Sequence, residues 1–418
     1  MDKLALFGGS PAVENHPEEF RKSQRWPVLG GEELGAISRL FEDANISTHP
    51  VIRELEAAYA GFSGRTHALA HNNGTAALLA AYWALDLKPG DKVLVPTATF
   101  WASVLPMLWL GLVPVFCESD GTTLGMDLAD MQAKLDSRTR AMVVVPLWGY
   151  PCDYDAQLEF AERNGLRVIE DASHAHGATW KGKPCGSFGD VSVFSLQGDK
   201  LAPAGEGGVF LTNERALWDR ANLLGDITRI GELPTADRRF AATSFGIKTR
   251  IAPVSAAIGL EQLRKLSSNN AVRKTNIEPL SRALSRHGFA TYGDDPDRSR
   301  VYFEFLVRHV DGPLDAEGWR EALEAEGCVV GRPRYPLLHQ QPFFVEGSFA
   351  DILRLPPGEI APDYRGLDLP RTRALNESLL KLPHFPNPAP DLVASYAMAI
   401  EKVGSSQDEI CRWRASRP

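Results

Sequence analysis

Short apolar runs alternate with helical patterns over residues 67–211, and this alternation constrains the fold more than any other feature. Helical patterns between the runs lie at 75–87, 101–110, 128–135 and 154–164. The strand-like runs lie at 67–70, 92–95, 113–116, 141–145, 167–169, 191–194 and 208–211. Strands that alternate with helices form βαβ units and a parallel sheet covered on both faces. The sequence therefore predicts an α/β fold with a seven-stranded, mainly parallel sheet.

The pattern divides the 418-residue chain into three parts. Residues 1–30 are rich in Gly, Pro and charge and predict an N-terminal arm, and residues 31–265 predict one large domain. Residues 266–418 predict a smaller α+β domain, although their Pro-rich part at 331–390 shows no clear pattern. Helices are expected at 255–266, 275–288, 314–326 and 394–403, and a strand at 300–308.

Charge and cysteine usage exclude several classes of protein. The net charge is −8, from 45 basic and 53 acidic residues, which argues against nucleic acid as a partner. The five cysteines form no CxxC pair, so neither a metal site nor a disulfide framework is expected. The apolar runs are too short for a secretory signal or a membrane span. We therefore expect a cytoplasmic protein that does not bind membranes.

Lys200 lies in a loop of small residues that follows the apolar run 191–194. A lysine near packed strands is partly desolvated, and desolvation favours the neutral, nucleophilic amine. Such an amine forms Schiff bases with carbonyl compounds, above all with pyridoxal phosphate (PLP). A lone lysine in a turn is far more often a surface residue, so this interpretation depends on partner residues elsewhere.

Asp171 and His174 are candidate partners at the end of the run 167–169. A carboxylate at the end of a buried strand must be paired, either with a protonated pyridine nitrogen or with a helix N-terminus. His174 is placed to reach a ring hydroxyl or to be a satisfied core residue. The residues alone favour neither alternative.

Other strand ends carry residues suited to a phosphate and a flat ring. Gly74 and Thr75 open a helix after a strand, as in phosphate-binding turns, but Asn and Thr caps look the same in sequence. Ser195 offers a further hydroxyl. Phe100 can stack on a ring or pack in the core. These loops meet at one edge of a parallel sheet, where such folds bind ligands.

Several segments together resemble the DegT/StrS family of PLP-dependent sugar and cyclitol aminotransferases, from about residue 30 to 385. The segments are NNGTAALLAAYWAL (72–85), KPGDKVLVPTATF (88–100), GLVPVF (111–116), VPLWGYPCDYDA (145–156), VIEDASHAHGATWKGKPCGSFGDVSVFSLQGDKLAPAGEGG (168–208) and SAAIGLEQL (255–263). The resemblance implies the fold-type I architecture and a homodimer whose active sites are shared between subunits.

The resemblance also implies a role for individual residues. It assigns Lys200 to the Schiff base with PLP, Asp171 to the pyridine nitrogen and His174 to the vicinity of the ring oxygen. It places Phe100 against the ring. The phosphate positions fall on Gly74, Thr75 and Ser195.

Three positions depart from the family pattern. Asn73 stands where the family usually has Ser, and Cys152 replaces a usually small residue. Lys248 stands where the family usually has the Asn that reaches the neighbouring subunit's phosphate; a lysine can still bind phosphate as a point charge. Lys200 itself follows the transaminating members, since the family's dehydratases carry His there.

The substrate side is less determined by the sequence. Tyr335 and His339 lie in a segment that resembles a family segment at the domain junction, and Ser47 and His49 precede a helix. All four are candidate substrate contacts, with packing as the alternative. The opening residues resemble the branch of scyllo-inosose aminotransferases and 3-amino-5-hydroxybenzoate synthases.

We therefore expect a PLP-dependent aminotransferase that moves an amino group from glutamate or glutamine to a keto-sugar, nucleotide keto-sugar or keto-cyclitol, in secondary-metabolite or glycan biosynthesis. Two alternatives remain at this stage. One is an aromatising dehydratase similar to aminohydroxybenzoate synthases, and the other is a non-catalytic PLP-binding regulator or partner subunit.

Overall fold

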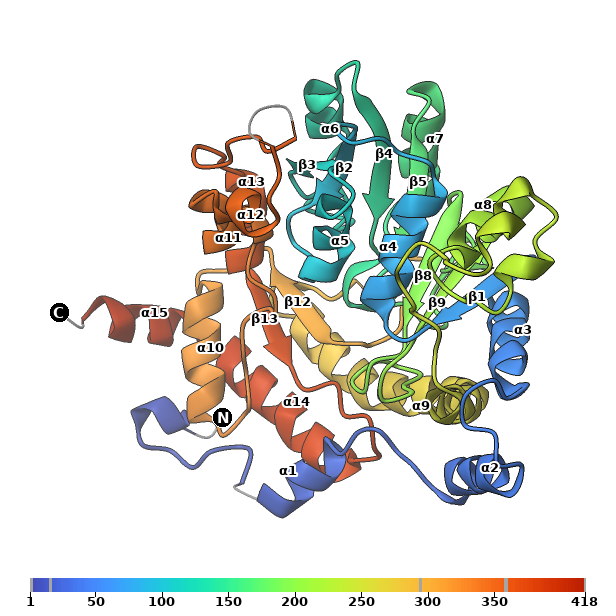
Figure 1. Cartoon of the computed structure of the whole chain (residues 1–418). Coiled ribbons are helices and arrows are strands. Elements are labelled where there is room, and N and C mark those ends of the chain that lie inside the picture. The colour runs from blue at the N-terminus through green and yellow to red at the C-terminus, as the bar shows by residue number, and fades with distance from the viewer. Residues whose placement is uncertain (1–2, 15–16, 293–294, 357–359, 417–418) are drawn as a thin grey trace.

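The computed structural model describes residues 3–14, 17–292, 295–356 and 360–416. Its central feature is a seven-stranded sheet with the order β1-β9-β8-β5-β4-β2-β3 (Figure 1). The strands are β1 (His67–His71), β2 (Lys92–Pro96), β3 (Val113–Cys117), β4 (Thr139–Val144), β5 (Arg167–Asp171), β8 (Val191–Ser195) and β9 (Gly208–Thr212). All seven lie where the apolar runs predict them, which confirms the α/β fold class.

One strand runs against the others. β9 pairs antiparallel with both β1 and β8, whereas the remaining pairs are parallel. The chain between β8 and β9 therefore turns back at the sheet edge instead of crossing over through a helix. Lys200 lies in this turn, at the same edge as the C-terminal end of β5.

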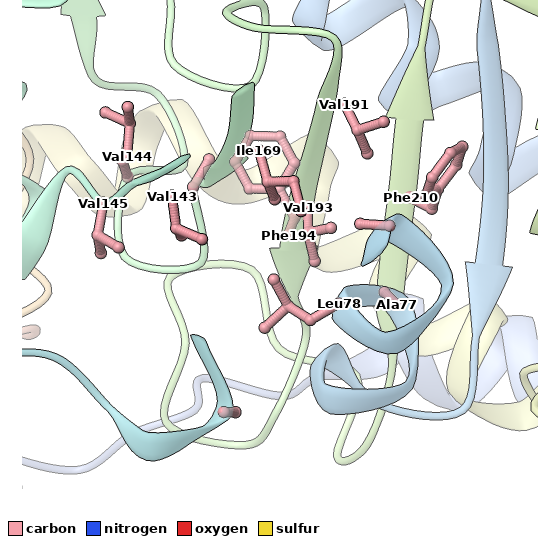
Figure 2. Packing of buried hydrophobic residues seen from close by; sticks show 14 of the residues in the cluster. Ala77, Leu78, Val143, Val144, Val145, Ile169, Val191, Val193, Phe194 and Phe210 are labelled. Carbon is pink, nitrogen blue, oxygen red and sulfur yellow. The ribbon is translucent and has the colours of Figure 1, made fainter. Parts of the chain in front are cut away.

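Helices cover the sheet because its strands are apolar on both faces. Helix α4 (Gly74–Ala84) packs on β8 and β9, and Ala77 and Leu78 face these strands in Figure 2. Its face is formed by small residues, which allows close approach to Phe194 and Phe210. The other helices of this part are α2 (Gly31–Glu42), α3 (Val51–Ser63), α5 (Leu105–Leu108), α6 (Leu128–Lys134), α7 (Tyr154–Arg163) and α8 (Arg215–Asn222).

A second, smaller core lies around the sheet β10-β12-β13. It is flanked by helices α10 and α14 (Figure 1). Leu4 and Val13 of the N-terminal arm are buried in this core rather than in the first one. The elements are α1 (Pro17–Ser23), β10 (Phe289–Ala290), β12 (Phe305–His309), α10 (Ala316–Ala325), β13 (Leu379–Leu382), α14 (Pro390–Gly404) and α15 (Gln407–Ala415).

The Pro-rich segment that shows no clear sequence pattern packs largely against the first core. Phe344, Phe349 and Tyr364 are buried there together with Phe116 of β3. The α-helices among the described residues of this segment are short: α11 (Pro342–Val345), α12 (Ser348–Ile352) and α13 (Pro370–Glu377). Its fold therefore depends on tertiary contacts, which local periodicity does not encode.

Two expectations for the second half of the chain are wrong. The helices expected at 255–266 and 275–288 are one helix, α9 (Pro253–Ser285), which passes through the expected domain boundary at residue 265. It packs on α2 and α3 at one end and on α14 at the other, so its polar centre stays helical. The strand expected at 300–308 is only β12, because residues 301–304 are buried without pairing in the small sheet.

A third small sheet joins β6 (Thr179–Trp180), β7 (Lys183–Pro184) and β11 (Arg298–Ser299). It connects the loop after β5 with the chain that enters the second core. Within the described ranges, none of the helices has the length and apolar composition needed to cross a lipid bilayer.

Candidate active site

A cavity of about 820 Å³ opens at the edge of the sheet where β5 and β8 end. Most of the predicted site residues line it, namely Gly74, Thr75, Phe100, Asp171, His174, Ser195, Lys200 and Tyr335. They come from five loops far apart in sequence, so the sheet topology brings them together as open α/β sheets do.

Lys200 is buried in the wall of this cavity, with 7% of its surface exposed. Its backbone is fixed by two contacts: its N–H donates to the Gln197 carbonyl (2.8 Å), and its carbonyl accepts from the Trp26 indole (3.0 Å). Burial lowers the pKa of the amine from 10.5 to about 8, and the Asp171 charge opposes this shift only in part. A substantial fraction of the amine is therefore neutral near physiological pH.

Asp171 ends β5 and is held by two donors. The Ser103 hydroxyl donates to Oδ2 (2.6 Å), and the Ser173 backbone N–H donates to Oδ1 (3.2 Å). Thr99 in turn lies 2.9 Å from the Ser103 hydroxyl. The carboxylate is 5% exposed, so its remaining exposed surface lies in the cavity. This orientation suits a cationic ring nitrogen as its partner.

The first turn of α4 forms a close-fitting cradle. A Cβ on Gly74 would lie 2.8 Å from the Ser195 Cβ, and one on Gly208 would lie 2.4 Å from the Asn73 carbonyl oxygen. Asn73 is the helix cap, since its side chain accepts from the Ala76 N–H (2.8 Å). Asn73 thus caps the helix, whereas Thr75 and Ser195 line the cavity at the helix N-terminus, a position that favours an anion.

Four stacked rings lie next to Lys200, and two of them, His174 and Tyr335, line the cavity. His174 stacks on Phe303 (centroids 4.1 Å apart), and Trp148 stacks on Tyr335 (4.8 Å). The backbone N–H of Trp148 donates to His174 Nδ1 (3.4 Å), and the Tyr335 hydroxyl lies 3.3 Å from Nε2. Burial, reinforced by the Lys200 charge, lowers the His174 pKa well below its ordinary value. The ring is therefore neutral, and since Nδ1 accepts, we assign the proton to Nε2.

A charged rim lies above these rings, and sequence reasoning did not identify it. Arg334 lines the cavity and is held by Glu304 (2.7 Å) and Asp199 (3.2 Å). Glu304 is fully buried and also binds Lys381 (2.8 Å). Gln197 and Glu206 add further polar groups to the rim. The only available sequence signal was the proximity of Arg334 to Tyr335.

Other contributors were also missed. Ser103, which orients Asp171, lies in the loop after β2, three residues after the predicted Phe100. Trp148 adopts a left-handed backbone (φ 61°), which is uncommon for a residue other than glycine and occurs at sites where a side chain must be aimed. Nothing in the local sequence indicates that conformation.

Four predicted residues lie outside the cavity of their own chain. The prediction that His339 contacts the substrate is wrong. His339 is 1% exposed, and its Nδ1 lies 2.7 Å from the Thr97 hydroxyl, so it packs behind the site. His49 binds Asp43 (2.9 Å) and accepts from the Val51 N–H at the start of α3. The Ser47 hydroxyl accepts a hydrogen bond from Arg250 (3.1 Å). Lys248, two residues before Arg250, is exposed.

The cavity fits a flat, phosphorylated aldehyde. One end offers a carboxylate for a ring nitrogen, the other a helix N-terminus with two hydroxyls for a phosphate, and the wall carries a desolvated amine for the aldehyde. Among the described residues, no three His, Cys, Asp or Glu side chains are grouped to hold a metal ion. The fold and the site thus define a PLP-dependent enzyme of fold type I.

The particular family follows from sequence comparison. Residues 27–395 match the model of the DegT/DnrJ/EryC1/StrS aminotransferase family, and the chain belongs to this family. It is a PLP-dependent aminotransferase, as the sequence predicts.

Individual relatives are similar over much of their length. The chain is 30% identical to the L-glutamine:scyllo-inosose aminotransferase of Streptomyces griseus, covering 99% of this chain and 100% of the relative. It is 38% identical to the GDP-perosamine synthase of Caulobacter vibrioides over 63% of this chain and 70% of that one. An aminotransferase structure from Psychrobacter cryohalolentis matches with a TM-score of 0.79 at 26% identity, covering 92% and 99% of the two chains.

Proposed function

We propose that this aminotransferase moves an amino group from glutamate or glutamine to the ketone of a sugar, nucleotide sugar or cyclitol, in secondary-metabolite or glycan biosynthesis. One observation carries the proposal: Lys200, Asp171 and the α4 cradle face a single cavity. Relatives named as perosamine synthase and scyllo-inosose aminotransferase support the class of acceptor.

The cavity residues have distinct tasks in such a reaction. PLP, when bound, supplies an electron sink for the carbon that loses its proton. Asp171 keeps the ring nitrogen protonated, because a fixed carboxylate favours the adjacent cation. Lys200, with its pKa near 8, accepts a proton from one carbon and returns it to another, since a group that titrates near the working pH can do both. Neutral His174 can donate a hydrogen bond to the ring oxygen of the cofactor without adding a positive charge to the site.

The rim is suited to a polyhydroxylated acceptor and a carboxylate donor. Gln197, Asp199 and Glu206 present hydrogen-bonding groups, while Phe100 and Trp101 present apolar faces. This mixture of polar groups and rings is the usual composition of a specific small-molecule site.

The Arg334 guanidinium matches the carboxylate of an amino-acid donor. Its Nε is occupied by Glu304 and one terminal nitrogen by Asp199, which fix the plane of the group. A planar guanidinium binds a carboxylate in a bidentate manner better than a lysine does. We assign the donor carboxylate to this residue.

A homodimer with shared sites accounts for the exposed apolar side chains. Leu34 and Phe41 of α2 are 67% and 69% exposed, and Trp109 is 71% exposed. Trp101 is 43% exposed although it lines the cavity, so a second subunit would cover the cavity mouth. Large exposed aromatic groups of this kind are typical of subunit interfaces.

Ser47, His49 and Lys248 then serve the neighbouring subunit's cavity. Arg250 links Ser47 to the segment that carries Lys248, so the three residues belong to one surface region. We place Lys248 against the neighbour's phosphate, and Ser47 and His49 near its substrate.

The five free thiols are consistent with a cytoplasmic protein.

Spectroscopy and product analysis test the proposal. Purified enzyme with PLP should be yellow, and borohydride reduction should attach the cofactor to Lys200, as shown by peptide mass spectrometry. Excess glutamate or glutamine should convert it to the pyridoxamine form, and a panel of keto-sugars and keto-cyclitols should reverse this. A protein that takes up no PLP, or that takes it up and never converts, would contradict the proposal; an aromatic product from a cyclic enone would indicate the dehydratase reaction instead.

A further inference from the structure

The buried Lys200 amine lies over the ring of Phe303, as the Arg334 guanidinium does at a longer distance. Nζ lies 4.3 Å from the centroid of Phe303. Among the described residues, no carboxylate oxygen lies within 4.0 Å of this nitrogen. The charged groups that act on it from further away are Asp171, Arg334, Asp199 and Glu304, and the Lys200 charge acts in turn on His174 and His176.

Phe303 is held firmly in this position. The Val301 N–H donates to the Gly149 carbonyl (3.0 Å), which ties the segment to the loop after β4, and β12 begins at Phe305. The Phe303 ring is 4% exposed and lies parallel to His174, with 13° between the planes. Both ends of the short segment are thus fixed, and one ring face is turned to Lys200.

A ring face and a carboxylate would affect the amine differently. The face of an aromatic ring attracts a cation through the ring quadrupole. This attraction is weaker than that of a carboxylate in a desolvated ion pair. A carboxylate at contact distance would raise the pKa of the lysine and hinder loss of its proton. The ring therefore holds the ammonium in place and leaves the proton exchangeable, which is what a residue that both accepts and donates protons requires.

We propose that the face of Phe303 is the docking surface for the Lys200 amine whenever Lys200 is not covalently joined to PLP, which makes Phe303 a positioning residue. This inference rests on the proposed function, because it requires that Lys200 form and release a Schiff base with PLP in each cycle. In the released state, Phe303 keeps the amine buried beside the cavity.

The test measures protonation of Lys200 in the full-length enzyme loaded with pyridoxamine 5′-phosphate, in which Lys200 is free. Trace acetylation across pH, followed by peptide mass spectrometry, gives the pKa of this one amine. Phe303→Leu keeps the site apolar but removes the ring, and should lower the Lys200 pKa by about one unit. At one pH unit below the wild-type pKa, labelling of Lys200 should then be about fivefold faster.

Matched variants separate this effect from a general loss of structure. Phe305→Leu truncates a buried ring in the second core two residues away and should leave the Lys200 pKa unchanged. Phe303→Tyr retains the ring and should also retain the pKa, and Phe303→Met provides a second ringless variant if the leucine variant does not fold. An unchanged or raised pKa in a folded ringless variant would overturn the inference. Failure of the wild type to bind PLP at Lys200 would instead overturn the proposed function.

Discussion

The two walls of the cavity differ in how they are built. The cofactor wall, with Asp171, Lys200 and the α4 cradle, comes from strand ends of one sheet. The opposite wall, with Tyr335 and with Arg334 over the buried Phe303 ring, comes from irregular segments that enter or leave the second core. The first wall follows from sheet topology, because parallel strands end at a common edge; the second depends on how two cores pack together.

The difference suggests that the cofactor wall determines whether any reaction occurs, whereas the opposite wall determines which molecules react. Variants on the two walls should therefore separate into losses of turnover and losses of affinity. The largest effects are expected on the cofactor wall.

Lys200→Ala should have the largest effect. Under the proposed function it removes both the attachment point for PLP and the group that moves the proton, so kcat should fall by at least about a thousandfold. Borohydride should no longer attach the cofactor to the protein. The variant should fold, because Lys200 forms no salt bridge with another described residue that the substitution would break. Turnover at the wild-type rate would contradict the role assigned to Lys200.

Asp171→Asn should reduce kcat by about a hundredfold, since the neutral amide no longer favours a protonated ring nitrogen. Ser103 can still donate to the Asn oxygen, so the cavity should keep its shape. Circular dichroism and the melting temperature check the fold, and steady-state kinetics check the rate. Ser173→Ala is the control: Ser173 donates to Asp171 through its backbone, so kcat should hardly change.

The same contrast explains what the sequence predicts. The apolar runs locate all seven strands, and the strand-end residues Asp171 and Lys200 are found because such loops converge. Phe303 was missed because its run, 300–308, shows strand periodicity although residues 301–304 are unpaired. His339 was misplaced because a histidine on a site loop and one behind it have the same local sequence. In both cases the position of the side chain depends on packing between distant parts of the chain, which the local sequence does not show.

Arg334→Gln tests the opposite wall and should act on affinity. Loss of a charge-assisted bidentate contact, about 1.5–3 kcal/mol, should raise the KM for the amino donor by about 10- to 150-fold and leave PLP binding intact. Arg332→Gln is a matched control: this arginine is 72% exposed and binds Glu317 outside the cavity. A drop in kcat without a change in donor KM would place Arg334 elsewhere in the reaction.

The smallest of these effects tests whether the cofactor wall is completed by a second subunit. Lys248→Ala should weaken PLP binding by about tenfold, the effect of one exposed point charge on a phosphate. Lys274→Ala, which removes another exposed lysine, should not. Mixed dimers of Lys248→Ala and Lys200→Ala chains are more decisive, since one of their two sites combines an intact Lys200 with an intact Lys248 from the other chain. At limiting PLP, these mixed dimers should recover cofactor affinity at that site; if Lys248 acts within its own chain, every site with an intact Lys200 keeps the weakened affinity.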